Sequence, residues 1–213
     1  MNTAHPAVAP IPGLCSLSTL PLDRLHEGLF HLACKTCAGP TASRLRFQAE
    51  ARELLALAQL SRRLRLHSLD LSCGLRAEVE LTAPVPCLPD PTKPLRVASR
   101  ALLGLLYPQE AIFTPQPGYV FVRLLHPWGI WHSNVSPDHN QVLCLGPSLP
   151  AGIPLKEIVL MTYGALTLQT IQIDRLDPAG VLNPAAGDWW QQNSRLIPLT
   201  HEPFLPAEAK HAA

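Results

Sequence analysis

The sequence lacks long apolar runs and carries almost no net charge. No apolar stretch reaches the ~18 residues that a membrane-spanning helix needs. Lysine plus arginine number 17 and aspartate plus glutamate 16, a formal net charge of +1 that provides no basic surface for nucleic acid. The first residues also lack the basic start of a secretory signal. We therefore expect a cytoplasmic protein that binds neither membranes nor nucleic acid, and whose partner is another protein or a small molecule.

The cysteines are few in number for a disulfide framework and irregularly spaced. The chain has six cysteines in 213 residues, a pattern that argues against a disulfide framework and favours a reducing compartment. Cys34 and Cys37 form a Cys-x-x-Cys pair, which is half of a zinc site that Cys15 or Cys73 would have to complete. A redox pair and an uninvolved pair are the other interpretations. Because no second pair follows at zinc-finger spacing, we expect neither a metal nor a cofactor.

Proline, in contrast, is abundant. The 23 prolines cluster near positions 6–12, 84–94, 108–117, 147–154 and 198–206. Proline interrupts helices and central strands, so these clusters are expected to be loops or extended connectors. The length suits one domain. We expect residues 1–40 to be an N-terminal extension, 41–200 the main domain and 201–213 a tail.

Helical spacing of apolar residues marks three segments. Residues 43–64 repeat apolar side chains every three to four positions, and Thr41 or Ser43 is a candidate N-cap. Residues 154–171 carry a second apolar face of the same period. In the segment LNPAAGDWWQQN, asparagine is expected to cap a short helix and proline to take its first position.

Strand patterns lie between these helices. Residues 75–81 alternate apolar and charged side chains, which predicts a half-buried strand. Residues 95–105 and 119–125 also indicate strands, and residues 82–94 a proline-rich loop. Strands that follow one another, with helices before and after them, are typical of the α+β class with an antiparallel sheet.

One cysteine stands out by its surroundings. Cys144 lies in HSNVSPDHNQVLCLGPSLP, residues 132–150, ten positions after Asn134. A buried core thiol is the simplest interpretation, since free cysteine is among the most buried residue types. The other is a working nucleophile at the surface, next to a side-chain amide.

Three short motifs, taken in order, resemble the ubiquitin-conjugating enzymes. They are His132-Ser133-Asn134, then Val142-Leu143-Cys144-Leu145, then the run Leu182-Asn183-Pro184-Ala185-Ala186. They match the family's His-Pro-Asn motif, its catalytic-cysteine segment and its Leu-Asn-Pro-x-Ala-Ala element. The resemblance covers roughly residues 43–195. It departs in Ser133, where the family has proline, and in a spacing from Asn to Cys of ten instead of eight. With these departures the chain is similar to the bacterial branch of the family. Members of that branch are encoded in operons with a ubiquitin-like protein, its activating enzyme and an isopeptidase, and some of these operons act against phage.

The resemblance implies a fold and an activity. The fold would be an N-terminal helix, a four-stranded antiparallel meander, the catalytic-cysteine segment, a central helix and a short C-terminal helix. Cys144 would accept a ubiquitin-like protein as a thioester and pass it to an amine. Asn134 would donate a hydrogen bond to the oxyanion, and His132 would hold the asparagine loop through backbone hydrogen bonds. Asp174 or Asp177 would help to remove the proton of the amine, although a solvated turn aspartate explains either one.

Two other functions stay open at the level of the sequence. A conjugating-enzyme-like domain without catalysis would serve as a binding module for a ubiquitin-like protein. Alternatively, Cys144 could pair with His126, His132 or His139 in a Cys/His hydrolase, although papain-like and caspase-like signatures are absent.

Overall fold

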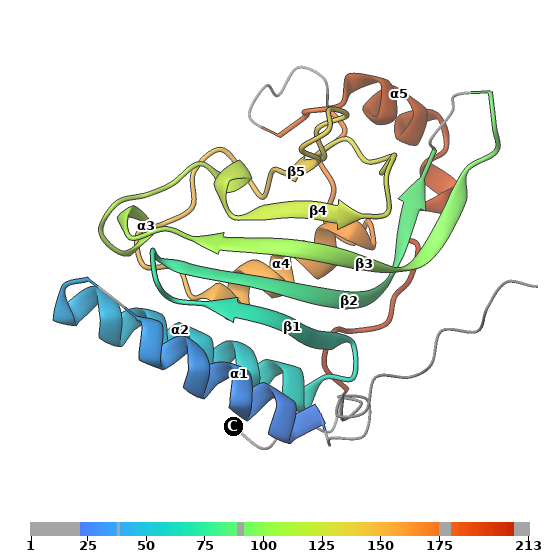
Figure 1. The fold of residues 1–213 in the computed structure, drawn as a ribbon. Coiled ribbons are helices and arrows are strands. Elements are labelled where there is room, and N and C mark those ends of the chain that lie inside the picture. The colour runs from blue at the N-terminus through green and yellow to red at the C-terminus, as the bar shows by residue number, and fades with distance from the viewer. Residues whose placement is uncertain (1–21, 38, 89–91, 175–179, 207–213) are drawn as a thin grey trace, which may run out of the picture.

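An antiparallel sheet backed by helices forms the body of the protein (Figure 1). The computed structural model describes residues 22–37, 39–88, 92–174 and 180–206. The helices are α1 (Leu22–Thr36), α2 (Thr41–Leu60), α3 (Glu110–Phe113), α4 (Leu155–Leu166) and α5 (Pro184–Gln192), with short 3-10 turns η2 (Gly118–Val120) and η3 (Ser194–Leu196). The strands are β1 (Leu64–Asp70), β2 (Leu75–Cys87), β3 (Arg96–Tyr107), β4 (Val122–His126) and β5 (Val142–Leu143).

The sheet confirms the α+β class but has one strand more than expected. Its five strands are ordered β1-β2-β3-β4-β5, and every neighbouring pair is antiparallel. The expected meander of four strands is therefore wrong in its count. The added strand is β5, a two-residue strand that pairs with β4 and ends directly before Cys144.

Two bulges explain where the strand predictions failed. The sequence pattern did not indicate β1. Its register shifts between Leu66 and Ser68, so buried and exposed residues alternate over its first four residues and not beyond them. The proline-rich loop expected from residue 82 is instead part of β2, which continues to Cys87. The register of β2 shifts between Thr82 and Val85, and a bulge is a place where a strand tolerates proline.

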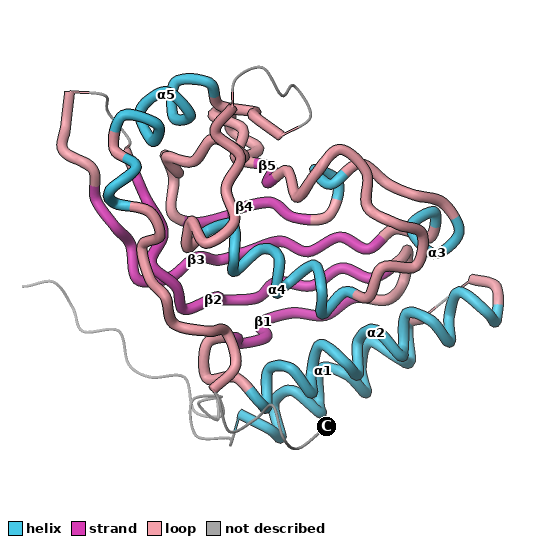
Figure 2. The backbone as a smooth tube through the Cα atoms, turned by 180° about the vertical axis from the view of Figure 1, so that it is seen from behind, coloured by secondary structure: helices cyan, strands magenta, loops and turns pink. Residues whose placement is uncertain are grey.

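Three helices, α1, α2 and α4, cover one face of the sheet and one edge. In Figures 1 and 2, α4 crosses one face, and α1 and α2 lie side by side along the β1 edge. Buried leucine, valine and alanine side chains of β1 to β4 form one core with α2 and α4. Among the helices of the described residues, none combines the length and apolar character that crossing a bilayer requires.

The helix ends fit the predictions in part. Asn183 caps α5, because its side chain accepts a hydrogen bond from the backbone N–H of Ala186 at 3.1 Å, and proline follows at the first position. The cap expected at Thr41 or Ser43 is wrong, since Pro40 is the N-cap residue of α2 and makes no side-chain bond.

Residues at both ends of the chain contribute to this core. Ala33 of α1 is buried with the sheet and helices, although it lies in the predicted extension. Phe204, in the predicted tail, packs edge-on against Tyr163 of α4 with ring centroids 5.4 Å apart. The body of the fold therefore includes packing from residues outside 41–200.

A buried carboxylate fixes where α4 begins. Glu50 of α2 accepts a hydrogen bond from the backbone N–H of Leu155 at 2.6 Å and pairs with Arg46 at 2.6 Å. Burial raises the pKa of Glu50 above its ordinary value, and these partners oppose that rise. Because α4 forms one wall of the pocket described below, this contact ties the pocket to the first helices of the domain.

Candidate active site

Cys144 follows β5 directly, and main-chain contacts hold it beside Asn134. Leu143 of β5 pairs with Val122 of β4 and also bridges to Val135. The backbone N–H of Cys144 donates to the carbonyl of Asn134 at 2.8 Å. The two residues that the sequence singled out, ten positions apart, are therefore neighbours through the backbone.

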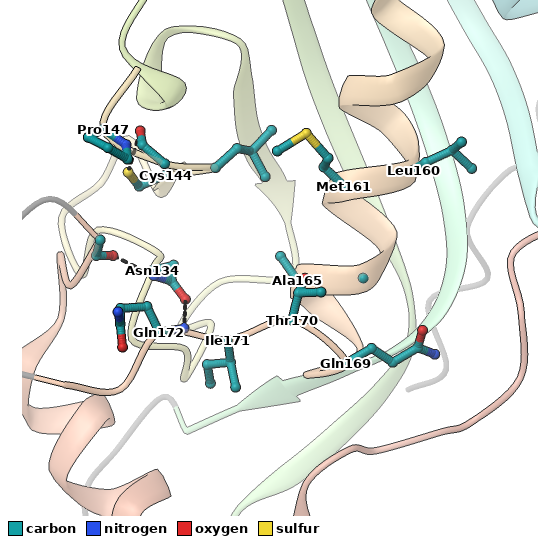
Figure 3. Close-up of a pocket in the computed structure, with 14 residues that line it drawn as sticks. Asn134, Cys144, Pro147, Leu160, Met161, Ala165, Gln169, Thr170, Ile171 and Gln172 are labelled. Atoms are coloured by element: carbon teal, nitrogen blue, oxygen red, sulfur yellow. Dashed lines mark hydrogen bonds between the residues drawn. The ribbon is translucent and has the colours of Figure 1, made fainter. Parts of the chain in front are cut away.

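Both residues line one open pocket of about 630 Å³. Its walls come from residues 144–147, from the face of α4 that includes Met161 and Gly164, and from residues 169–172 with Gly180 (Figure 3). A pocket with a thiol in one wall and a carboxamide beside it can hold a carbonyl group between a nucleophile and a hydrogen-bond donor.

The sulfur of Cys144 lies in the wall of this pocket and does not stand on open surface. The residue is 6% exposed, and its Sγ–H donates to the carbonyl of Gly146 at 3.4 Å. The expectation of a surface thiol is therefore wrong in degree. Because Cys144 also lines the pocket, a substrate has to enter the pocket to reach it.

The carboxamide of Asn134 is oriented by two backbone groups. Its Oδ1 accepts a hydrogen bond from the N–H of Gln172 at 3.2 Å, and its Nδ2 donates to the carbonyl of Gly180. An N–H can only donate and a carbonyl can only accept, so these partners decide which end of the amide is nitrogen. The Nδ2 group carries two hydrogens, and the bond to Gly180 uses one of them.

His132 makes the backbone hydrogen bonds expected of it. Its Nδ1 accepts from the N–H of Asn134 at 3.0 Å, so Nε2 carries the proton and donates to the carbonyl of Ala165 in α4 at 2.8 Å. The ring is fully buried, and this burial lowers the pKa of His132 to about 4, which keeps it neutral at pH 7. With both ring nitrogens engaged, His132 positions the asparagine loop and is not available as a base.

Ser133, the position at which the sequence departs from the motif it resembles, uses its side chain in the same network. Its hydroxyl donates to the carbonyl of Gln172 at 2.5 Å and lies 3.3 Å from Oδ1 of Asn134. Its own carbonyl accepts from the N–H groups of Leu182 and Asn183, both at 2.8 Å. Residues 133 and 134 therefore bind Gln172 and the segment 180–183, two parts of the connection between α4 and α5.

Gln141 is a structural residue that the sequence did not reveal. It is buried, and its Oε1 accepts from the N–H groups of Gly129 and Ile130 at 3.0 and 3.2 Å. Its Nε2 donates to the carbonyls of Leu124 and Pro127 at 3.1 and 3.0 Å. Gln141 directly precedes β5, so its side chain ties the turn after β4 to the start of β5. A single glutamine before a short apolar strand has no recognisable signature, so no signal could have found it.

Gly118 sets the position of the chain just after Cys144. Its N–H donates to the carbonyl of Gly146 at 3.1 Å. A Cβ at this position would lie 2.6 Å from the Gly146 oxygen and 2.9 Å from the nitrogen of Leu145, closer than real contacts allow. Only glycine lets the two backbones approach this closely.

The remaining predicted residues are not brought to the pocket. Asp174 is exposed, its backbone N–H donates to Oε1 of Gln172, and it is not part of the lining; Asp177 lies outside the described residues. His126 and His139 are exposed and do not line the pocket either, within the part of the chain that the structure describes. The Cys/His pairing therefore gains no support from the geometry.

The Cys-x-x-Cys pair lies away from this region. Cys34 is on α1 and Cys37 follows its end, and burial raises the pKa of both thiols. Cys73 is exposed in the turn between β1 and β2, and Cys15 lies outside the described residues. In residues 22–37, 39–88, 92–174 and 180–206, no three His, Cys, Asp or Glu side chains are grouped so that they could hold a metal ion.

Comparison with known proteins gives no relative for this chain. No protein-family model, curated protein or solved structure matches it. The α+β fold and the pocket at Cys144 are therefore the basis for any functional inference.

Proposed function

We propose that the chain is a ubiquitin-conjugating-enzyme-like acyl transferase, which acts in the cytoplasm of a bacterium. Cys144 accepts the C-terminus of a ubiquitin-like protein from an activating enzyme and passes it to an amine. Its partners are the ubiquitin-like protein, the activating enzyme and an isopeptidase of the same pathway. Defence against phage is one process that such a pathway serves. The observation that carries the proposal is that Cys144 and Asn134 are backbone neighbours and line one pocket.

The chemistry balances without a cofactor. The sulfur of Cys144 attacks the thioester carbonyl, a new C–S bond forms, and the bond to the sulfur of the activating enzyme breaks. The departing thiolate takes up the proton that Cys144 loses. A cysteine thiol suits this exchange because it is intrinsically a strong nucleophile and the incoming acyl group is already activated.

In this proposal, Asn134 stabilises the oxyanion formed in each attack. The Nδ2 hydrogen that Gly180 does not use is the donor, and the bonds to Gln172 and Gly180 keep the amide from rotating. Removing one such donor typically slows a reaction ~10²–10³-fold. We expect Asn134→Ala to slow both charging and discharge by this order. Asn134→Asp keeps the size but replaces the donor with an acceptor and should be as slow.

The test is a charging assay with the activating enzyme, ATP and the ubiquitin-like protein. Wild type should form an adduct that dithiothreitol removes, Cys144→Ser should form one that dithiothreitol does not remove, and Cys144→Ala should form none. Cys87→Ala, at another buried cysteine, is the matched control and should charge like wild type.

A binding module is the second candidate, and one observation favours it. Cys144 is 6% exposed and its thiol donates to the carbonyl of Gly146, an arrangement that also suits a structural cysteine. A chain that binds the ubiquitin-like protein, keeps that affinity as Cys144→Ala and never becomes charged would fit this second function and contradict the first.

A further inference from the structure

The first half of β3 has one neighbouring strand instead of two. Residues 96–101 pair with β2, whereas β4 pairs with β3 only from Leu102 onward. Figure 1 shows this part of β3 as the outer strand of an arm that extends beyond the end of β4. In the part of the chain that the structure describes, no other segment pairs with residues 96–101. The arm therefore presents a free strand edge.

The edge is open because the chain after β4 joins the opposite side of the arm. Pro127 follows the last residue of β4 and has no N–H to continue the ladder. Ile130 then forms an antiparallel bridge with Cys87 of β2, whose other partner is Arg96. Because the two partners of one strand residue lie on opposite sides of it, residues 129–131 cover β2 and leave the edge of β3 uncovered.

This edge is exposed and has an arginine at each end. Arg96 and Arg100 are exposed, as are Val97 and Ser99 between them. The side chain of Arg100 is 64% exposed, and its contact with Glu80 at 3.4 Å is a surface ion pair, which contributes little. An exposed strand edge is a template for a further strand, because its outward N–H and C=O groups have no partner strand.

A pocket of about 310 Å³ adjoins the edge. Val97, Ala98 and Ser99 line it from β3, and residues 82–84 of β2 line it together with Arg63. When a peptide adds to a sheet edge, main-chain hydrogen bonds give affinity and pockets for its side chains give specificity. The arm thus offers both parts of a site for an added strand.

The two arginines decide between the possible occupants. A second copy of the chain, paired antiparallel over residues 96–100, would place Arg96 opposite Arg100 at both ends, and like charges directly opposite each other are destabilising. The N-terminal residues 1–21 contain four prolines and neither aspartate nor glutamate, so they lack donors and opposite charge. An extended segment with acidic side chains would instead pair each arginine with a carboxylate.

We propose that residues 96–101 of β3 bind an extended, acidic segment of a partner protein as an added strand. The segment carries acidic residues opposite Arg96 and Arg100, and an uncharged residue at the pocket between them. This interaction surface does not depend on the transfer reaction proposed for Cys144.

Fluorescein-labelled peptides with capped ends test this surface on the full chain. The probe contains Glu-Val-Thr-Val-Glu. A second peptide, Lys-Val-Thr-Val-Lys, reverses its charge, and a third, Glu-Pro-Pro-Pro-Glu, keeps the charge but lacks the central N–H groups. In fluorescence anisotropy, the glutamate probe should bind about tenfold more tightly than the lysine peptide, because two opposite-charge pairs replace two like-charge pairs. The proline peptide should not bind measurably, since it cannot form the ladder.

Charge reversal at the edge sharpens the result. Arg96→Glu combined with Arg100→Glu should invert the preference, so that the lysine peptide binds more tightly than the glutamate probe. The matched control is Arg24→Glu combined with Arg44→Glu, at exposed arginines of α1 and α2, which changes the net charge equally and should keep the wild-type order. The glutamate probe should also slow amide hydrogen exchange in residues 96–101 and leave that of α2 unchanged.

Other results would overturn the proposal. No binding of the glutamate probe at about 1 mM would show that the arginines only protect the edge from other strands. Equal binding of the glutamate probe and the proline peptide would show charge attraction without strand pairing, and slowed exchange outside residues 96–101 alone would place the probe elsewhere. A wild-type dimer in analytical ultracentrifugation, with residues 96–101 protected at its interface, would assign the edge to a second copy.

Discussion

The sheet and the loops around the pocket are stabilised by different kinds of side chain. In β2, alternate residues such as Val79 and Leu81 are fully buried in one apolar core with the helices. Around the pocket, buried positions are held by polar side chains instead, namely His132, Ser133 and Gln141, which bond to backbone groups of other segments. The fold thus builds its body from apolar burial and its site from hydrogen bonds.

This difference sets how each region responds to substitution. A core position tolerates an apolar residue of similar volume, because the contact area is kept. A buried hydrogen-bonding side chain is less replaceable, because its loss leaves backbone donors and acceptors without partners, at ~1–3 kcal/mol each. The pocket should therefore be the more fragile region, although it buries fewer large apolar groups.

Gln141→Leu should give the largest loss of stability. It removes bonds to Gly129, Ile130, Leu124 and Pro127, and we expect the free energy of unfolding to fall by ~4 kcal/mol. Two controls sharpen the comparison in urea titrations. Gln116→Leu, which removes an amide that donates to the exposed hydroxyl of Thr114, should change stability by less than ~0.5 kcal/mol. Leu103→Met, a similar-volume change in the sheet, should cost less than ~1.5 kcal/mol.

Acid should destabilise the pocket region through His132. Its pKa is about 4 in the folded chain and ~6.5 when unfolded, so the unfolded chain binds the extra proton between these values. The stabilisation is complete above pH 6.5 and is lost as the pH falls towards 4, by ~3 kcal/mol in all. Unfolding measured from pH 7 to 4 should show this slope, and His132→Gln should lack it. An equal slope in both proteins would mean that other groups cause the acid sensitivity.

Gly118→Ala should have a smaller effect that is concentrated at the thiol. The added Cβ would overlap Gly146 and Leu145, so the chain after Cys144 has to move, at a cost of ~2 kcal/mol. We expect the rate of Cys144 alkylation by iodoacetamide to change as well. Gly28→Ala, where nothing lies within 4 Å, is the control: it should raise stability by ~0.5–1 kcal/mol, because alanine suits the interior of α1 better than glycine, and it should leave the alkylation rate unchanged. Unchanged alkylation in Gly118→Ala would show that Gly118 does not position the thiol.

The sequence predicted the apolar body better than the site, for the same physical reason. Residues 75–81 alternate without interruption, and the structure has β2 there. The cap and first turn of α5 depend on neighbouring residues, so Asn183 was found. The strand β1 was missed because a bulge after Leu66 breaks its alternation. A regular sequence pattern therefore predicts a strand or helix, and a bulge that interrupts the pattern makes the strand hard to predict.

Contacts between distant segments were largely beyond the sequence. The partners of Gln141 lie 11 to 17 positions away, and Asn134 reaches Gln172 and Gly180 at distances of 38 and 46 positions. No periodicity links such residues. Asn134 and Cys144 were paired only because their motifs resemble a family, and their proximity is what the fold adds.

The most direct measurement is to locate the adduct formed with ATP, the activating enzyme and the ubiquitin-like protein. After digestion, mass spectrometry should find the C-terminal remnant of that protein on Cys144, and dithiothreitol should release it. A remnant on Cys34, Cys37, Cys73 or Cys87 with Cys144 unmodified, or an adduct that persists in Cys144→Ala, would contradict the account.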